Sequence, residues 1–268
     1  LSSCSPAVLE EPVFQDRLLS EWLEDFDRGQ STQTWNQASM AVRNMGTNTL
    51  PFLVAWIQFE GSPFRSGTNF PNSRRPLEGV FGALGPIAKP AIPELIGLLN
   101  NQKDRVRGEA AFALGLIGEE PDVTVPPLIT LLESSGFPDN FMSRAMAVYS
   151  LGMFGAEAKS AMPILMEMLF DPDLDDVHGA LRTSVAYYGL RKIAPKEFVE
   201  ALIEKMKDPD PWVRGNAIGS MHHFGDEWRP AKAMLLEAQK DTDSRIRESA
   251  TMMLKHLNSA DSVGEGEK

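Results

Sequence analysis

The sequence predicts an all-α fold, an α-solenoid (α–α superhelix) built from about six stacked helical pairs. Three observations lead to this prediction. An apolar or small residue followed by arginine recurs along the chain, a glycine or asparagine follows most of these arginines at a fixed distance, and the apolar residues between them have helical spacing. Because separate copies carry the same signals, they support one another.

The repeated arginines set the period. Successive arginines lie 37, 38, 32 and 33 positions apart, and they are Arg107, Arg144, Arg182, Arg214 and Arg247. Eleven positions after four of them come Gly118, Gly155, Gly225 and Asn258. Glycine and asparagine tolerate the left-handed conformation that ends many helices, so we expect a helix to end at each of these positions.

One complete unit is "AIPELIGLLNNQKDRVRGEAAFALGLIG", residues 91–118. Its apolar spacing predicts a first helix that begins near Ile92, a short turn at Asp104 and a second helix that ends with the unit. Proline favours the first turn of a helix because it has a fixed φ and no backbone N–H. Pro127 and Pro163 therefore predict the starts of the first helices in the next two units.

Small residues in the second helix predict close stacking of neighbouring units. They are Gly108, Ala110, Ala111, Ala113 and Gly115. One helical pair cannot bury its own apolar stripe, and stacking covers that stripe with the next pair. Small side chains let the neighbouring helix approach closely enough to do so.

The repeated arginine has a structural and a functional interpretation. An aspartate precedes three of the arginines by three or four positions, and these acids are Asp104, Asp210 and Asp243. Because the acid recurs with the base, we favour a structural role in which each arginine ties the turn to its helix. The alternative is a row of arginines that grips an anionic ligand.

A proline-led first helix, an Asp-containing turn, "VR" and "ALGLIG" (residues 113–118) together resemble the HEAT repeat, in particular the short bacterial form also seen in phycobilisome-lyase-type proteins. The resemblance covers residues 37–258 and implies a solenoid of HEAT-like helical pairs. It departs from the pattern near Arg182, where "GLRKIAP" stands in place of the glycine stop.

The expected organisation has four parts. These are an extended N-terminal tail over residues 1–14, a capping helix region over 15–36, a HEAT-like solenoid over 37–258 with a loop insertion at 61–75, and a disordered C-terminal tail over 259–268.

Composition excludes several classes of protein. The chain has 268 residues, a formal net charge of −11 and one cysteine, Cys4. A negative surface repels the phosphate backbone, so we expect no nucleic-acid partner. A single cysteine excludes an internal disulfide and a Cys-rich metal site. No apolar run approaches the roughly 20 residues of a membrane-spanning helix.

The opening "LSSC" resembles the end of a bacterial lipoprotein signal, in which the cysteine carries the lipid. This resemblance implies attachment to a membrane only through Cys4 and an extracytoplasmic bacterial lipoprotein. The alternative is an artificial start of the chain and a cytoplasmic protein, and both stay open.

A third face of the second helices remains once core and stacking positions are removed. Counting about 100° per residue, it holds the second, fifth and ninth positions after each arginine. Its candidate partner-binding residues are Glu109, Phe112, Leu116, Met146, Tyr149, Met153, Tyr187, Arg191, His223 and His256. The HEAT resemblance implies that this face is concave, and aromatic and methionine side chains there favour a groove for a protein or peptide. The alternative is that these side chains seal adjacent repeats.

The insertion "GSPFRSGTNFPNSRR" is basic and aromatic in an acidic chain. Its candidate residues are Phe64, Arg65, Phe70, Arg74 and Arg75. A loop of this composition is suited to gripping an acidic partner surface or a phosphate. The alternative is a mobile connector that neutralises nearby acids.

The sequence contains no recognisable catalytic constellation. It has no glycine-rich phosphate loop and no serine nucleophile motif, and its four histidines have no carboxylate at ligand spacing. We therefore expect no metal and no cofactor, and we predict a monomeric, non-enzymatic scaffold that binds a protein or peptide. Two alternatives remain: a bilin-lyase-like enzyme or chaperone on a HEAT-like scaffold, which the resemblance implies, and a lipid-anchored structural envelope component.

Overall fold

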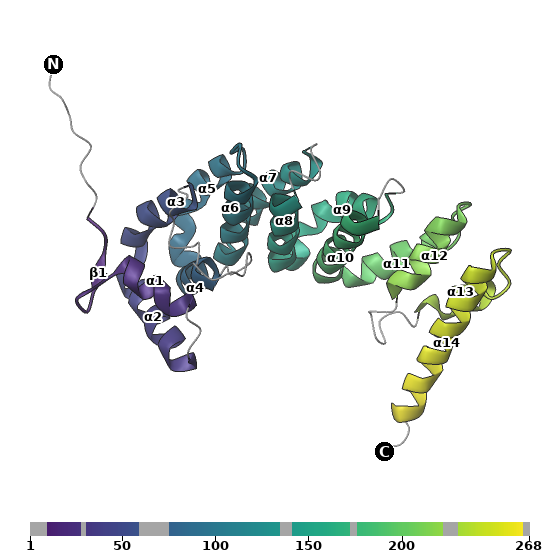
Figure 1. The fold of residues 1–268 in the computed structure, drawn as a ribbon. Helices are drawn as coiled ribbons and strands as arrows, with labels where there is room; N and C mark the ends of the chain where they lie inside the picture. Colours follow the sequence, from purple (N-terminus) through teal and green to yellow (C-terminus); the bar gives the residue numbers. More distant parts are fainter. Residues whose placement is uncertain are drawn as a thin grey trace. The chain divides into compact units, whose positions relative to one another are not determined.

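The chain folds as an all-α solenoid, which confirms the predicted fold class. The computed structural model describes residues 10–27, 31–58, 75–134, 141–171, 176–221 and 230–264 (Figure 1). It divides into two compact units, Leu1–Phe154 and Gly155–Lys268, which we describe separately.

The first unit begins with a short hairpin and continues with helices. Its elements are β1 (Val13–Phe14), β2 (Arg17–Leu18), α1 (Leu19–Asp27), α2 (Thr32–Met45), the 3-10 helix η1 (Gly46–Thr49), α3 (Leu50–Gln58), α4 (Arg75–Leu84), the 3-10 helix η2 (Gly85–Ala91), α5 (Ile92–Leu98), α6 (Asp104–Ile117), α7 (Pro121–Glu133) and α8 (Phe141–Phe154). We call α3, α5 and α7 the A helices of this unit, and α2, α4, α6 and α8 its B helices. Successive B helices pack against one another.

The second unit has the same alternation. Its elements are the 3-10 helix η3 (Gly155–Ala161), α9 (Met162–Leu169), α10 (Asp176–Ile193), α11 (Pro195–Lys205), α12 (Pro211–Ser220), α13 (Lys232–Ala238) and α14 (Ser244–Gly264). Its A helices are α9, α11 and α13, and its B helices are α10, α12 and α14. The described part of the chain thus contains six A–B pairs, α3–α4, α5–α6, α7–α8, α9–α10, α11–α12 and α13–α14.

Glycines end the B helices of the first unit in the left-handed conformation. Gly118 and Gly155, which follow α6 and α8, have φ of 66° and 56°, as predicted. The prediction for Asn258 was wrong, because α14 runs through it to Gly264 and thus into the segment expected to be a tail. Asparagine has only a weak preference against helix interiors, so it does not break a helix by itself. Gly225 lies outside the described residues.

The prolines predicted the start of α9 correctly and the start of α7 incorrectly. Pro163 lies in the first turn of α9, as expected. Pro127 lies inside α7, which begins at Pro121 and has already completed its first turn before Pro127. Pro121 has the fixed φ that suits a helix start, so it takes the role assigned to Pro127.

Small residues bring α6 and α8 close together, as predicted. A side-chain carbon added at Gly115 would lie 2.7 Å from the Cα, Cβ and Oγ of Ser150. The Ser150 hydroxyl is buried and donates to the carbonyl of Ala111 at 2.6 Å. The same contact therefore supplies close packing and a partner for a buried polar group.

Three of the five repeated arginines, Arg107, Arg214 and Arg247, clamp their own turns, and for these three the structural interpretation is confirmed. Each of these guanidinium groups donates from one nitrogen to two backbone carbonyls, six and five positions earlier in the chain. The bonds are Arg107 to Asn101 and Gln102 at 2.7 and 3.0 Å, Arg214 to Asp208 and Pro209 at 2.9 and 2.9 Å, and Arg247 to Asp241 and Thr242 at 2.7 and 3.0 Å.

The aspartates do not all pair as predicted. Arg107 bonds Asp104 at 3.1 Å, as expected, but Arg214 pairs with Asp241 of the next turn at 2.8 Å. Asp210 instead caps α12 by accepting from the backbone N–H of Trp212 at 2.8 Å, and Asp243 pairs with Arg245. An aspartate just before a helix satisfies a free N–H of the first turn, and this role competes with pairing to the arginine.

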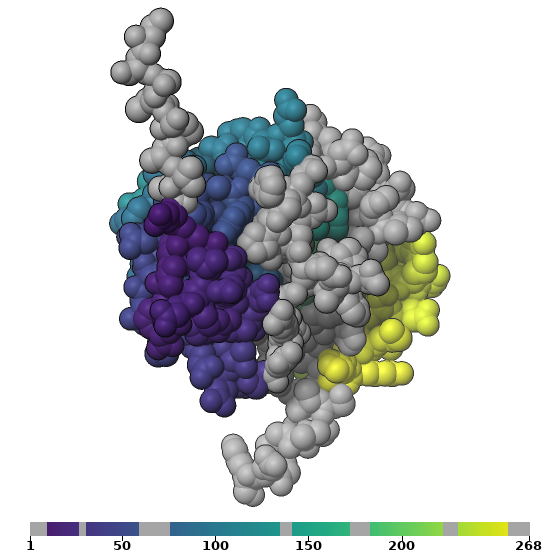
Figure 2. Space-filling view, turned by 60° about the vertical axis from the view of Figure 1, so that its left-hand side comes forward, coloured from purple at the N-terminus to yellow at the C-terminus, as the bar shows by residue number. Residues whose placement is uncertain are grey.

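The N-terminal hairpin was not predicted. Its turn residues Gln15 and Asp16 have φ of 51° and 59°, a conformation that joins two adjacent strands. The guanidinium of Arg17 lies 3.8 Å from the ring centroid of Trp22 on α1. Figure 2 shows the hairpin and α1 as one purple patch on the surface beside α2, which both elements contact.

Candidate functional site

A groove of about 630 Å³ lies on the B-helix face of the first unit. Three successive B helices, α2, α4 and α6, form it, and Figure 1 shows them following one another along the unit. Its lining residues are Trp35, Asn36, Ser39, Met40, Arg43, Asn44, Glu78, Gly79, Gly82, Ala83 and Leu116. Five of these eleven residues are polar or charged, so the groove is an open surface of mixed apolar and polar character.

Helix α2 provides the wall of the groove. Ser31 caps its first turn by accepting from the backbone N–H of Thr34 at 3.1 Å, which fixes where the helix begins. Trp35 is half-buried and packs edge-to-face against Phe26 of α1, with ring centroids 4.7 Å apart. Met40 lies one and a half turns further on and is 49% exposed. The wall thus consists of the Trp35 indole, which Phe26 holds in place, and the exposed Met40 side chain, which can change rotamer to fit a partner.

Two glycines of α4 line the floor of the groove, so no side chain covers the helix backbone at these positions. Gly79 is required by packing, because a side chain there would overlap the ring of Phe26. Gly82 has no such reason, since an added side-chain carbon would have no atom within 4 Å. A glycine inside a helix costs about 1 kcal/mol relative to alanine. Packing does not explain why position 82 is a glycine. The missing side chain leaves open space on the floor of the groove.

Two charged side chains line the groove. The Nε of Arg43 donates to the carbonyl of Ala83 at 2.7 Å, so the end of α4 holds this guanidinium in place. Glu78 is exposed near the start of α4 and has no hydrogen-bond or ion-pair partner among the described residues. The groove therefore has a negative charge, Glu78, near the start of α4 and a positive charge, Arg43, near its end.

Of the residues predicted on this face, the groove includes only Leu116. Glu109 lies on the same helix but pairs with Arg105 at 2.7 Å. Met146 is only 3% exposed and belongs to the core, because a B helix with neighbours on both sides buries more than one stripe. Met153 is 44% exposed at the end of α8, and Tyr149 is half-buried, as is Phe112 on α6 (residues 104–117).

The predicted residues of the second unit take different positions. The ring of Tyr187 packs against Phe198 with centroids 5.6 Å apart, which favours the sealing role for this aromatic. Arg191 and His256 are exposed on α10 and α14. Phe112, Tyr149 and Tyr187 belong to two units, so a continuous aromatic row stays a prediction.

Several predicted residues lie outside the described part of the chain. They are Cys4, Phe64, Arg65, Phe70, Arg74 and His223. Arg75 is described only as the first residue of α4. The lipid attachment at Cys4 and the gripping role of the insertion therefore stay predictions.

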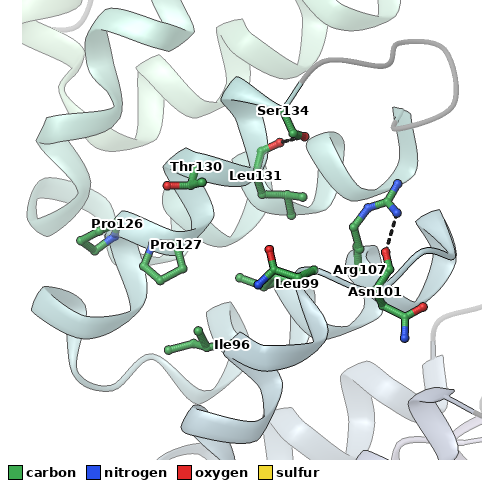
Figure 3. A pocket seen from close by; sticks show the side chains of 10 residues that line it. Ile96, Leu99, Asn101, Arg107, Pro126, Pro127, Thr130, Leu131 and Ser134 are labelled. Atoms are coloured by element: carbon green, nitrogen blue, oxygen red, sulfur yellow. Dashed lines mark hydrogen bonds between the residues drawn. The ribbon is translucent and has the colours of Figure 1, made fainter.

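A second hollow, of about 570 Å³, lies between the A helices α5 and α7 (Figure 3). Ile96, Leu99 and Leu131 give it apolar walls, and Arg107 reaches it from α6. That guanidinium already bonds two carbonyls of its turn and the carboxylate of Asp104. Because its charge is paired within the chain, the hollow is not suited to an anion.

The lowered carboxylate pKa values among the described residues belong to ion pairs in the second unit. The hydrogen bond from Arg214 lowers the pKa of Asp241, and the bond from Lys159 of η3 lowers the pKa of Glu197 on α11. The hydrogen bond from Arg245 lowers the pKa of Asp243 to about 2. Each shift comes from a neighbouring cation that favours the ionised carboxylate.

Within the described ranges, no group of three or more His, Cys, Asp or Glu side chains is placed to hold a metal ion. The same residues include no helix that is both long and apolar enough to cross a bilayer.

Sequence reasoning missed most of the groove because α2 and α4 are loose copies of the repeat. The Arg–eleven–Gly spacing used to find the face fails there, since Arg43 precedes Gly46 by only three positions. The sequence nevertheless indicates that Met40 is a surface candidate, because this methionine interrupts the polar stripe of an otherwise amphipathic helix. Aligning Gly46 with Gly118 places Met40 at the position of Phe112, a predicted partner-binding residue.

A family comparison decides the relationship. The family model described as HEAT repeats matches residues 92–186 and 183–255, which together cover more than half of the chain. The chain belongs to the HEAT-repeat family. A search of curated proteins found no match. Among solved structures, this HEAT-repeat chain is similar to a chain in the complex of CpcE and CpcF of phycocyanin lyase from Nostoc sp. PCC7120, with 20% identity over 95% of this chain and 100% of that chain and a TM-score of 0.39.

Proposed function

We propose that this HEAT-repeat protein is a non-enzymatic scaffold that binds a protein or peptide along its B-helix face, with the groove of α2, α4 and α6 as the primary contact. The observation that carries the proposal is an open groove with a 49% exposed methionine on its wall and a glycine without a packing role on its floor.

Burial of the wall provides binding energy. Covering a fully exposed Met side chain contributes about 1.5–3 kcal/mol, so covering the exposed half of Met40 contributes about 1 kcal/mol. Trp35 and Leu116 add further apolar contact at little entropic cost, because both are already half-buried and held by neighbouring helices. Aromatic and methionine side chains are enriched in protein interfaces, and tryptophan is among the residues that most often dominate binding.

The experiment compares capture of partners by three proteins from an extract of the native host. They are the wild type, Met40→Lys, and Val123→Lys, which adds the same charge at a 52% exposed apolar residue on the A helix α7. We expect a partner that the wild type and Val123→Lys retain equally and that Met40→Lys loses by at least about tenfold, equivalent to 1.4 kcal/mol.

Two results would contradict the proposal. Equal capture by Met40→Lys and Val123→Lys would remove the groove as the contact. A stable coloured adduct formed on mixing the protein with bilin would replace the non-enzymatic scaffold with a lyase-type activity.

A further inference from the structure

We infer that the groove takes an extended peptide segment that carries a basic and an acidic side chain two residues apart, the basic one facing Glu78 and the acidic one facing Arg43. The inference rests on the proposed function and names the chemistry of the partner at the same site.

The open floor of the groove favours an extended chain over a helix. A helix with its side chains is about 10–12 Å across, so its side chains hold its backbone away from the surface on which it packs. An extended chain is narrower, since strands lie about 4.8 Å apart, and its backbone can approach the floor that Gly82 leaves open.

Polar groups along the groove match the needs of an extended backbone. A helix satisfies its own N–H and C=O groups, but an extended segment arrives with these groups unpaired. Asn36 and Ser39 line the groove from α2, and a carboxamide and a hydroxyl both donate and accept hydrogen bonds. Among the described residues neither has a side-chain partner, so both are available to a peptide.

Along the axis of α4, the levels of the two charged groups differ by about the spacing of same-face side chains in an extended peptide. Arg43 is bonded at the level of Ala83, five residues after Glu78 on α4, which corresponds to about 7.5 Å along the helix axis. In an extended chain, side chains two residues apart point to the same face and lie about 6.6 Å apart. A basic–x–acidic peptide, in either chain direction, therefore places both charges on the floor side.

The two charged residues of the groove determine where the acidic and basic side chains of the peptide bind. The Nε bond to Ala83 orients the guanidinium of Arg43, and its terminal nitrogens have no partner among the described residues. A guanidinium with both terminal nitrogens open matches a carboxylate in a bidentate arrangement. Glu78 offers a carboxylate to a lysine or arginine at the other end.

The experiment selects peptides with a display library of short random sequences. The wild-type protein is the bait, and peptides that also bind Gly82→Leu, which fills the floor, are discarded. A second selection uses Glu78→Lys as the bait, and a third uses Glu94→Lys, an equal charge reversal at an exposed residue of the A helix α5. Circular dichroism of each variant checks that its helices are retained.

We expect the wild type and Glu94→Lys to enrich the same peptides, with a basic and an acidic residue two positions apart. We expect Glu78→Lys to enrich peptides in which an acidic residue replaces the basic one. A synthetic wild-type-selected peptide should bind Glu78→Lys at least about tenfold more weakly than the wild type, a difference of 1.4 kcal/mol.

The outcomes separate this inference from the proposed function. Peptides that depend on Gly82 but carry no charge pair, or that are unchanged with Glu78→Lys, would overturn the charged motif and leave a peptide-binding groove. Enrichment of no peptide that depends on Gly82 would overturn the extended-peptide inference, while loss of a native partner with Met40→Lys would still support the proposed function.

Discussion

Two glycines inside B helices should respond in opposite directions to the same substitution. In Gly115→Ala the added carbon meets Ser150 at 2.7 Å, and two of the three nearest atoms belong to the backbone or to Cβ, which cannot rotate away. In Gly82→Ala the added carbon has no atom within 4 Å. Both substitutions replace a helix-interior glycine, so helix propensity favours both equally.

The contact distances set the magnitudes. Overpacking a close contact costs about 1–3 kcal/mol, and loss of the Ser150 hydrogen bond that the displaced helix can no longer make costs about 1 kcal/mol more. In each variant the higher helix propensity of alanine raises the free energy of unfolding by about 1 kcal/mol. We therefore expect Gly115→Ala to lower the free energy of unfolding by about 1–3 kcal/mol and Gly82→Ala to raise it by about 0.5–1 kcal/mol.

The assay is thermal unfolding followed by circular dichroism with the same probe for the wild type and both variants. A change of 1 kcal/mol moves the Tm of a chain of 150–250 residues by about 2–4 °C, so the two variants should differ by at least about 3 °C. A Tm for Gly115→Ala equal to or above that of Gly82→Ala would refute the reasoning, because it would show that α8 can move away from α6 at no cost.

Further predictions concern the hydrogen bonds of the repeat. Arg247→Ala should lower the free energy of unfolding by about 1 kcal/mol, because it releases two carbonyls of the turn, whereas Arg245→Ala, at a side chain that is 83% exposed, should change it by less than about 0.5 kcal/mol in urea titrations. Ser150→Ala should cost about 1 kcal/mol in the same titrations, and a neutral effect would show that its buried hydroxyl is not needed. The pKa of Asp241 is lowered by Arg214, so the ionised carboxylate stabilises the folded chain at pH values above its ordinary pKa of 3.8, and this contribution is lost as the pH falls through the lowered pKa. Asp241→Asn should therefore be less stable than the wild type at neutral pH and equally stable in strong acid, and a difference that does not change with pH would contradict the ion pair.

The repeat could be predicted because its signals are local and copied. A left-handed glycine after each of α6 and α8 and the arginine clamps of Arg107, Arg214 and Arg247 depend on residues within one unit. Asn258 and Pro127 show the limit of this reasoning. Each residue type tolerates more than one position in a helix, so the neighbouring residues decide whether a boundary falls there.

The candidate site could be predicted only in part. Leu116 was found because its spacing from Arg107 follows the regular repeat, whereas Trp35, Met40 and Glu78 lie on irregular copies. The difference between Gly79 and Gly82 cannot be read from α4 alone, because it depends on a ring of α1 that lies about fifty positions earlier in the chain.

The sequence by itself determined that the chain is a stack of helical pairs, because helix periodicity, turn residues and arginine clamps act over short distances and recur in several copies. The tertiary structure decided which helix face is hollow, which glycine supports packing and which acid each arginine meets. Those properties depend on contacts between residues of different repeats, and a periodic sequence gives the same local signals whether such a contact is tight or open.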